Sequence, residues 1–239
     1  MLVIATIGMA AGGAAPKREK PPERSESAIT FRNDMRKLWE DHITWTRLVI
    51  VSFAHDLPDR EPTVNRLLQN QDDIGNAIKP FYGEAAGAQL STLLREHITT
   101  AAEILAAAKA GDSAALDDAI ARWYANADEI AQFLSAANPE NWPLEETRAM
   151  MREHLDLTLA EAVARLEGRF ADDIAIYEQI HQQILHMADF LSLGIIDQFP
   201  KQFGSSRDDD DDHEEQGNGQ GNGRGKGHRR GNDTSDDDD

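Results

Sequence analysis

One six-residue pattern decides the fold, and it occurs three times: WEDHIT at residues 39–44, LREHIT at 94–99 and MREHLD at 151–156. Each copy begins with a large apolar residue, places an acidic residue before a histidine, and continues with an apolar residue. The copies lie 55 and 57 residues apart, a period that is typical of a repeated supersecondary unit. The sequence therefore predicts three αα-hairpin repeats.

Proline and glycine residues mark the expected ends of the helices around these copies. A proline inside a helix removes a hydrogen bond and costs about 3 kcal/mol, so helices should stop near prolines. The breaks leave six intervals with apolar residues at three- and four-residue spacing: 31–56, 62–80, 84–110, 113–137, 144–167 and 170–199. Short loops between long helices favour antiparallel neighbours, so we expect an all-α, up-and-down helical bundle of about six helices.

The composition excludes several classes of protein. The 239 residues include no cysteine, 43 acidic and 24 basic side chains, for a formal net charge of −19. The lack of cysteine excludes disulfide scaffolds and thiolate metal sites. A polyanion repels the phosphate backbone, so we expect no nucleic-acid partner.

The composition also divides the chain into four parts. Residues 1–16 are apolar and small like a secretory signal, although no basic residue precedes the apolar run, and 17–30 are expected to be a linker. The bundle domain is expected over 31–204. Residues 205–239, with acidic runs at 208–212 and 236–239, lack apolar side chains and are expected to be a disordered, solubilising tail, with loose cation binding as the alternative.

These parts predict an exported protein, located outside the cytoplasm in the cell envelope or secreted. Residues 1–16 are too short to span a bilayer, so no transmembrane span is expected in the mature chain. The alternative is that the apolar N-terminal segment is fortuitous.

The hairpin geometry places the three histidines in one layer of the bundle. Residues equally far from a turn lie at the same height in an antiparallel hairpin. With turns centred near residues 59, 111 and 168, His97 is level with Asn126, His154 with Gln183 and His42 with Asn76.

One interpretation of this layer is a metal site, because imidazoles and carboxylates from facing helices hold Fe, Mn or Zn in bundle cores. The aligned partner helices make Asp73, Glu129 and His186 equivalent. The candidate ligands are thus His42, His97, Glu129, His154 and His186, with Asp73, His181 and Asp189 as secondary candidates.

Two other interpretations stay open. The favoured one is a buried polar network, in which each histidine bonds an amide on the next helix and fixes the helix register. The amides available for it are Asn70, Asn76, Asn126, Gln132 and Gln183. The other is a small-molecule pocket. The local spacing supports metal only weakly, since the chain offers a single Glu-x-x-His motif at residues 178–181.

The stretch from Leu38 to Phe203, with LWEDH at 38–42, RWYANADEI at 122–130 and QFP at 198–200, resembles a family of small, uncharacterised, exported helical proteins of spore-forming bacteria. The resemblance implies an all-α domain and no catalytic residue. Members of that group carry the labels glycosyltransferase and acetylglutamate kinase. Such enzymes have α/β folds with glycine-rich nucleotide loops, which this sequence lacks.

The sequence also contains no phosphate-binding loop and no Gly-x-Ser-x-Gly motif. It therefore favours a non-catalytic binding or structural role, with a metal ion in the histidine layer as an added prediction. The alternative function is a metal-dependent oxidoreductase of the di-iron or manganese type that uses the same layer.

Overall fold

The computed structural model describes residues 25–204, and these residues contain no strand. The helices are α1 (Glu26–Ala54), α2 (Arg60–Ala110), α3 (Ser113–Ala137), α4 (Leu144–Leu166) and α5 (Phe170–Gln198), followed by the 3₁₀ helix η1 (Pro200–Phe203). The predicted all-α class is confirmed. The predicted signal segment, most of the linker and the acidic tail lie outside the described residues.

Helix α1 begins earlier than predicted. Ser25 is the N-cap, and its hydroxyl accepts a hydrogen bond from the Ala28 amide at 3.2 Å. Residues 26–30, expected to be linker, are therefore the first turn and a half of α1. At the start of α3, Asp112 caps the amide of Ala115 in the same way, at 3.0 Å.

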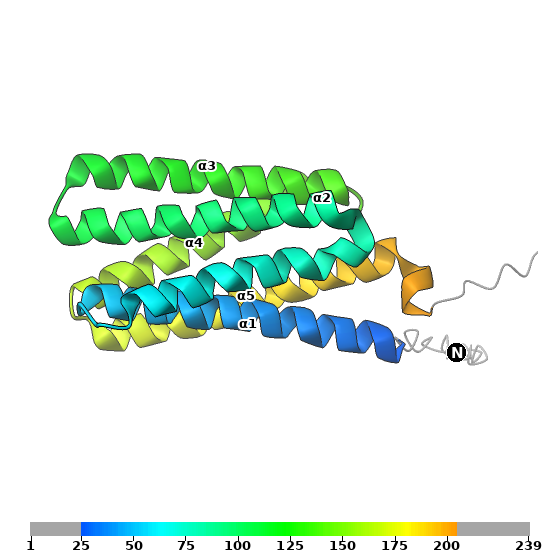
Figure 1. The fold of residues 1–239 in the computed structure, drawn as a ribbon, viewed down its shortest axis with the longest axis horizontal. Helices are drawn as coiled ribbons and strands as arrows, with labels where there is room; N and C mark the ends of the chain where they lie inside the picture. Colours follow the sequence, from blue (N-terminus) through cyan, green and yellow to red (C-terminus); the bar gives the residue numbers. More distant parts are fainter. Residues whose placement is uncertain (1–24, 205–239) are drawn as a thin grey trace, which may run out of the picture. The chain divides into compact units, whose positions relative to one another are not determined.

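Residues 25–204 form five α-helical elements where six were expected, because the intervals 62–80 and 84–110 follow each other without a loop in α2, which consists of two helices joined at a kink. This element has a non-helical residue at Gly83, with φ 86° and ψ 169°. Such a positive φ is open to glycine at little steric cost. Figure 1 shows α2 folding back on itself, so that its two halves run in opposite directions.

The two halves of α2 pack closely along a glycine contact. Gly75 faces Gly87, and a Cβ atom at Gly75 would lie 2.5 Å from the Gly87 carbonyl oxygen. Arg95 in the second half donates to the Leu68 carbonyl in the first half at 3.0 Å. The missing side chains thus allow the backbones to approach.

We expect Gly75→Ala to lower the free energy of unfolding by about 1–3 kcal/mol, because backbone atoms cannot yield to the new Cβ and the two halves must separate. Urea unfolding followed by circular dichroism measures this loss. Asn76→Ala, at the next residue and exposed, is the matched control and should change stability by less than about 0.5 kcal/mol. Equal stability of the two variants would contradict the close approach.

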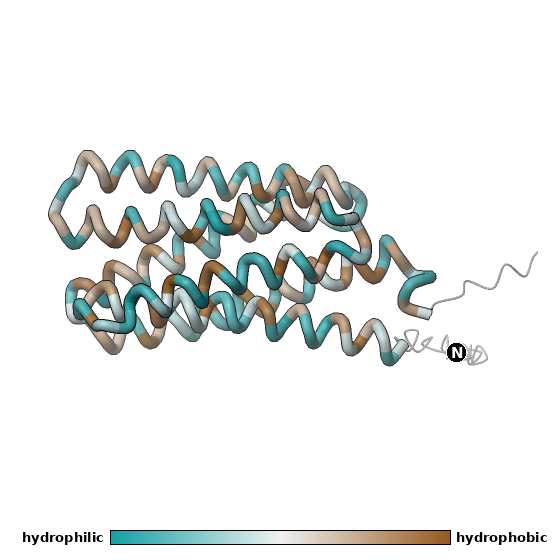
Figure 2. Tube along the Cα trace, viewed as in Figure 1, coloured by the Kyte–Doolittle hydropathy of each residue, from teal (hydrophilic) through white to brown (hydrophobic). Residues whose placement is uncertain are grey.

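The helices form a bundle in which α2 packs on α1 and α3, while α5 packs on α1 and α4, and α3 also contacts α4 (Figure 1). Apolar and polar residues alternate along every helix, as expected for helices with one buried face (Figure 2). None of the helices within residues 25–204 has an apolar stretch of membrane-spanning length.

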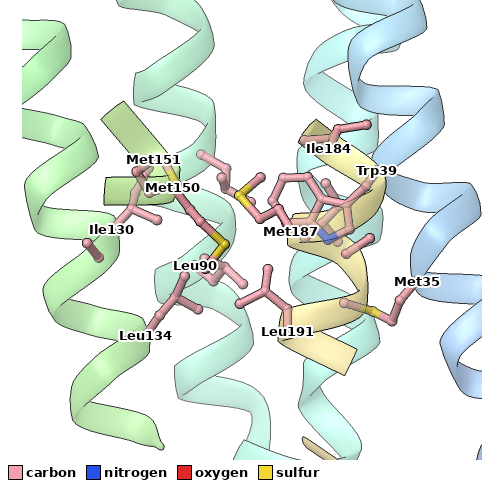
Figure 3. Packing of buried hydrophobic residues seen from close by; sticks show 14 of the residues in the cluster. Met35, Trp39, Leu90, Ile130, Leu134, Met150, Met151, Ile184, Met187 and Leu191 are labelled. Carbon is pink, nitrogen blue, oxygen red and sulfur yellow. The ribbon is translucent and has the colours of Figure 1, made fainter. Parts of the chain in front are cut away.

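The main core lies between all five helices. Leu90, Ile130 and Met150 point inward from α2, α3 and α4 (Figure 3). Met35 and Met187 meet them from α1 and α5. A second, smaller apolar cluster lies in the same bundle and consists of Val49, Ile50, Leu67, Ile98, Leu105 and Ala162.

The two ends of the described chain are joined by direct contacts. The Ser27 hydroxyl donates to the Phe203 carbonyl at 3.2 Å. The rings of Phe31 and Phe203 lie 5.3 Å apart, and Phe81 from the bend of α2 packs against both. The start of α1 and the 3₁₀ helix η1 therefore share one end of the bundle.

Candidate functional site

The structure brings the three patterned histidines together inside the bundle. His42 on α1, His97 on the second half of α2 and His154 on α4 are 2%, 3% and 3% exposed. The ring centroids of His42 and His154 lie 5.7 Å apart. We refer to these three residues as the histidine layer.

Each histidine has an amide residue 29 positions later on the following helical segment. The pair in α2 and α3 shows the arrangement most clearly. The Nδ1 atom of His97 lies 3.0 Å from Oδ1 of Asn126, and Nδ2 of Asn126 donates to the Leu93 carbonyl at 3.1 Å. Because Oδ1 can only accept, His97 carries its proton on Nδ1 and leaves the Nε2 lone pair free.

The pair in α1 and α2 differs from its prediction. His42 contacts Gln71, with Nδ1 of His42 3.3 Å from Nε2 of Gln71. The expected partner, Asn76, is exposed. The reason is the turn: α1 ends at Ala54 and α2 begins at Arg60, so the turn is centred near residue 57 and not 59. Asn70 supplies the bond to the backbone, donating to the Leu38 carbonyl at 3.0 Å.

The pair in α4 and α5 is incomplete. Gln183 donates to the Met150 carbonyl at 3.0 Å, as Asn126 does to Leu93. Yet Oε1 of Gln183 and both ring nitrogens of His154 are buried without a hydrogen-bond partner. A buried polar atom without a hydrogen-bond partner costs about 1–3 kcal/mol. A bound group that supplied a partner to His154 would therefore stabilise the layer.

Two tryptophans cover the layer. The ring of Trp123 stacks on His97 at a centroid distance of 5.1 Å, and the ring of Trp39 meets His42 at 5.6 Å. The indole Nε1 atoms of both are buried without partners. The histidine layer is thus enclosed by aromatic and apolar groups.

This enclosure keeps the histidines neutral. Burial lowers the pKa of His97 to about 3 and the pKa of His154 to about 4. Burial also lowers the pKa of His42 well below its usual value, and His154 and His97 lower it further. All three rings are therefore uncharged at pH 7, the form that binds metal ions.

The other predicted primary ligands lie elsewhere. Glu129 and His186 are exposed, so placing them in the layer was wrong. The buried positions of α3 include Asn126, Ala127, Ile130 and Ala131. Glu129 falls between these positions, on the outer face of the helix.

The secondary candidates are also away from the layer and have other partners. His181 bonds Glu40 at 2.9 Å. Asp189 accepts from Arg32 at 2.6 Å and is close to a second arginine at 2.8 Å. Asp73 lies 3.9 Å from the guanidinium of Arg66.

Within residues 25–204, no three His, Asp or Glu side chains form a preformed set that could hold a metal ion. The histidine layer is therefore an assembly of three neutral rings. At least one ring would have to turn before all three could coordinate the same metal ion. His154 is the ring with the freedom to turn, because neither of its nitrogens is held by a hydrogen bond.

A buried charge cluster was missed from the sequence. Arg47 on α1 donates to Glu161 on α4 at 2.5 Å and to Asp173 on α5 at 2.8 Å, and Arg165 donates to Asp173 at 3.1 Å. The side chains of Glu161 and Asp173 are 2% and 1% exposed. No local pattern reveals the cluster, because it forms only where α1, α4 and α5 pack together.

Comparisons with known proteins do not identify the site. The sequence matches no protein-family model, no curated protein and no solved structure. The resemblance to helical proteins of spore-forming bacteria stays a prediction.

Proposed function

We propose that this protein is a non-catalytic helical bundle that binds one divalent transition-metal ion through His42, His97 and His154. The observation that carries the proposal is His154, a buried neutral imidazole with both nitrogens unpaired beside two other neutral imidazoles. A metal ion would supply the partner that His154 lacks.

The amide partners support the same proposal. Metal-binding histidines commonly donate the second ring N–H to an oxygen acceptor, which fixes the tautomer and directs the other nitrogen to the metal. Asn126 does this for His97. Gln183 has an unpaired Oε1 on the segment that faces His154, available for the same role after the ring turns.

The donor set favours particular metals. Imidazole nitrogen suits Zn²⁺, Cu²⁺, Ni²⁺ and iron, whereas Mg²⁺, Ca²⁺ and Mn²⁺ prefer oxygen ligands. With Glu129 and His186 exposed, the layer supplies nitrogen only. Zn²⁺ and iron therefore fit better than manganese, and the carboxylate-rich ligand set of a di-iron oxidoreductase is not assembled at this layer.

The proposed role is binding and not turnover of an organic substrate. The cavity next to the layer has a volume of about 40 Å³, whereas pockets for small organic molecules typically measure about 300–1,000 Å³. An organic substrate of ordinary size therefore does not fit beside the layer.

The proposal includes three equivalent hairpins. The interval of 29 residues between histidine and amide recurs from His42 to Gln71, from His97 to Asn126 and from His154 to Gln183. In each hairpin an amide also bonds the backbone carbonyl four residues before the histidine. This recurrence supports duplication of one hairpin.

Metal content tests the proposal. We expect the full chain, purified without a histidine tag and loaded with Zn²⁺, to retain close to one ion per chain by elemental analysis. His154→Ala should lose at least ten-fold in Zn²⁺ affinity, since it removes one of three ligands. The matched control is His181→Ala, which removes a histidine outside the layer and should bind like the original chain.

Two results would contradict the proposal. One is a folded chain that retains no Zn²⁺, iron, copper or nickel after loading. The other is equal metal loss in the His154 and His181 variants, which would place the ion outside the layer. Either result would leave the buried polar network as the explanation of the layer.

Export is a separate proposal. It is supported by the apolar segment 1–16 alone, which lies outside the described residues. We expect cell fractionation to find the protein outside the cytoplasm, without residues 1–16. Recovery of the whole chain in the cytoplasmic fraction would refute export while leaving the metal proposal untouched.

A further inference from the structure

An apolar cavity that is partly open to solvent lies beside the histidine layer, one helical turn along the bundle. Its volume is about 40 Å³. Its wall includes Thr46 and Thr158, which follow His42 and His154 by four residues, and Trp123, which stacks on His97. The rest of the wall is apolar and consists of Val49, Ile50, Leu67, Ile98, Ala101, Ala102, Ile104, Leu105, Leu159 and Ala162.

Nearly every polar group in this wall already has a partner. Thr46 donates to the His42 carbonyl at 2.8 Å, and Thr158 donates to the His154 carbonyl at 2.8 Å. The indole Nε1 of Trp123 has no partner, but the atom is itself fully buried and is not exposed in the cavity. A bound water needs two to four polar partners, which this wall does not offer, so an apolar molecule should readily displace water from the cavity.

The volume limits the occupant. An engineered apolar cavity of about 150 Å³ stays dry and binds benzene or xenon. A cavity about a quarter of that size excludes an aromatic ring and accommodates a molecule of roughly two or three heavy atoms. An ion is excluded because the wall offers no charge or set of polar ligands.

We propose that this cavity binds a small, uncharged, apolar molecule of the size of dioxygen through contacts with its apolar wall. The inference goes beyond the metal proposal and does not depend on it, because the cavity and its wall exist without a bound ion.

Xenon is the probe that tests the cavity. The full chain, ¹³C-labelled at methyl groups, is titrated with xenon and followed by NMR. We expect saturable shifts confined to the methyl groups of the wall, above all those of Ile50, Ile98 and Ile104. A second titration with dioxygen should broaden the same methyl signals, because dioxygen is paramagnetic.

A filled cavity provides the control. Ala102→Leu adds apolar volume at a half-buried wall position and should abolish the xenon shifts. Ala121→Leu adds the same volume at an exposed position of α3 and should leave them unchanged. Circular dichroism and the melting temperature identify a variant that fails to fold, in which case Ala101→Val, at another half-buried wall position, replaces it.

Three results would overturn the inference: no xenon shifts in the folded chain, shifts of equal size across the surface, or persistence of the shifts in the filled, folded variant. A bound water detected by nuclear Overhauser effects to the wall methyl groups would also overturn it. None of these measurements involves metal, so failure of one proposal is distinguishable from failure of the other.

Discussion

Lowering the pH from 7 to 5 is expected to reduce the free energy of unfolding by about 4 kcal/mol. The cause is the histidine layer, where burial lowers the pKa of His97 to about 3 and the pKa of His154 to about 4, and lowers that of His42 as well. In the unfolded chain a histidine has a pKa of about 6.5. The unfolded state therefore takes up protons that the folded state refuses.

The sign and the pH range follow from these shifts. A group whose pKa is depressed on folding contributes stability above its unfolded pKa, and that stability is lost as the pH falls toward the folded pKa. At pH 5 His97 and His154 should each have lost about 2 kcal/mol, and the lowered pKa of His42 adds to this loss. Glu161 acts in the opposite direction, because burial raises its pKa to about 7 and its protonation favours the folded state at lower pH, offsetting about one histidine.

A loss of about 4 kcal/mol is large beside the 5–15 kcal/mol that stabilises a typical domain. Denaturant unfolding at pH 7 and pH 5, in metal-free buffer, measures it. His154→Gln removes one titrating ring that makes no hydrogen bond, so it should reduce the pH dependence by about 2 kcal/mol. His181→Gln, outside the layer, is the control. A pH dependence that is the same in all three proteins would contradict neutral burial of His154.

Arg47→Ala is expected to lower the free energy of unfolding by about 3–5 kcal/mol, because it leaves the buried carboxylates of Glu161 and Asp173 with too few cations. Arg47 bonds both of them, whereas Arg165 bonds only Asp173. Leaving a buried charge without its partner costs far more than the intact ion pair contributes.

An exposed arginine is the matched control. Arg122 pairs with Glu103 at 2.5 Å and with Asp118 at 2.9 Å, but its side chain is 49% exposed. Arg122→Ala should therefore lower the free energy of unfolding far less than Arg47→Ala does. Adding Glu161→Gln to Arg47→Ala removes one of the unpaired charges and should recover part of the loss in urea unfolding. Equal losses at Arg47 and Arg122 would refute the burial argument.

The helices could be predicted from the sequence because proline and glycine act locally. The turn at Gly111 was placed correctly, and with it the level of His97 and Asn126, which the hydrogen bond between them confirms. The first turn was misplaced by about two residues, and this error was enough to replace Gln71 with Asn76 as the partner of His42.

The rest of the site could not be predicted, because it depends on which helix faces are buried. The alignment made Glu129 equivalent to His186 and placed both three residues after a buried amide. Three residues turn a helix through about 300°, a net offset of about 60°. Because Asn126 lies at the edge of the buried face of α3, this offset is enough to place Glu129 outside it. The charge cluster around Arg47 could not be predicted for a related reason. Its members lie on α1, α4 and α5, and only the packing of these helices brings them together.

The contact between Ser27 and Phe203 also determines how the bundle responds to mechanical force. The ends of the described chain, at Ser25 and Gly204, leave the bundle at one point, beside the antiparallel pair of α1 and α5. Tension applied there would peel α1 from α5, breaking one turn of contacts after another instead of shearing the whole interface at once. We therefore expect the bundle to yield at low force in single-molecule pulling, however stable it is in denaturant, and a high-force, all-or-none rupture would refute this.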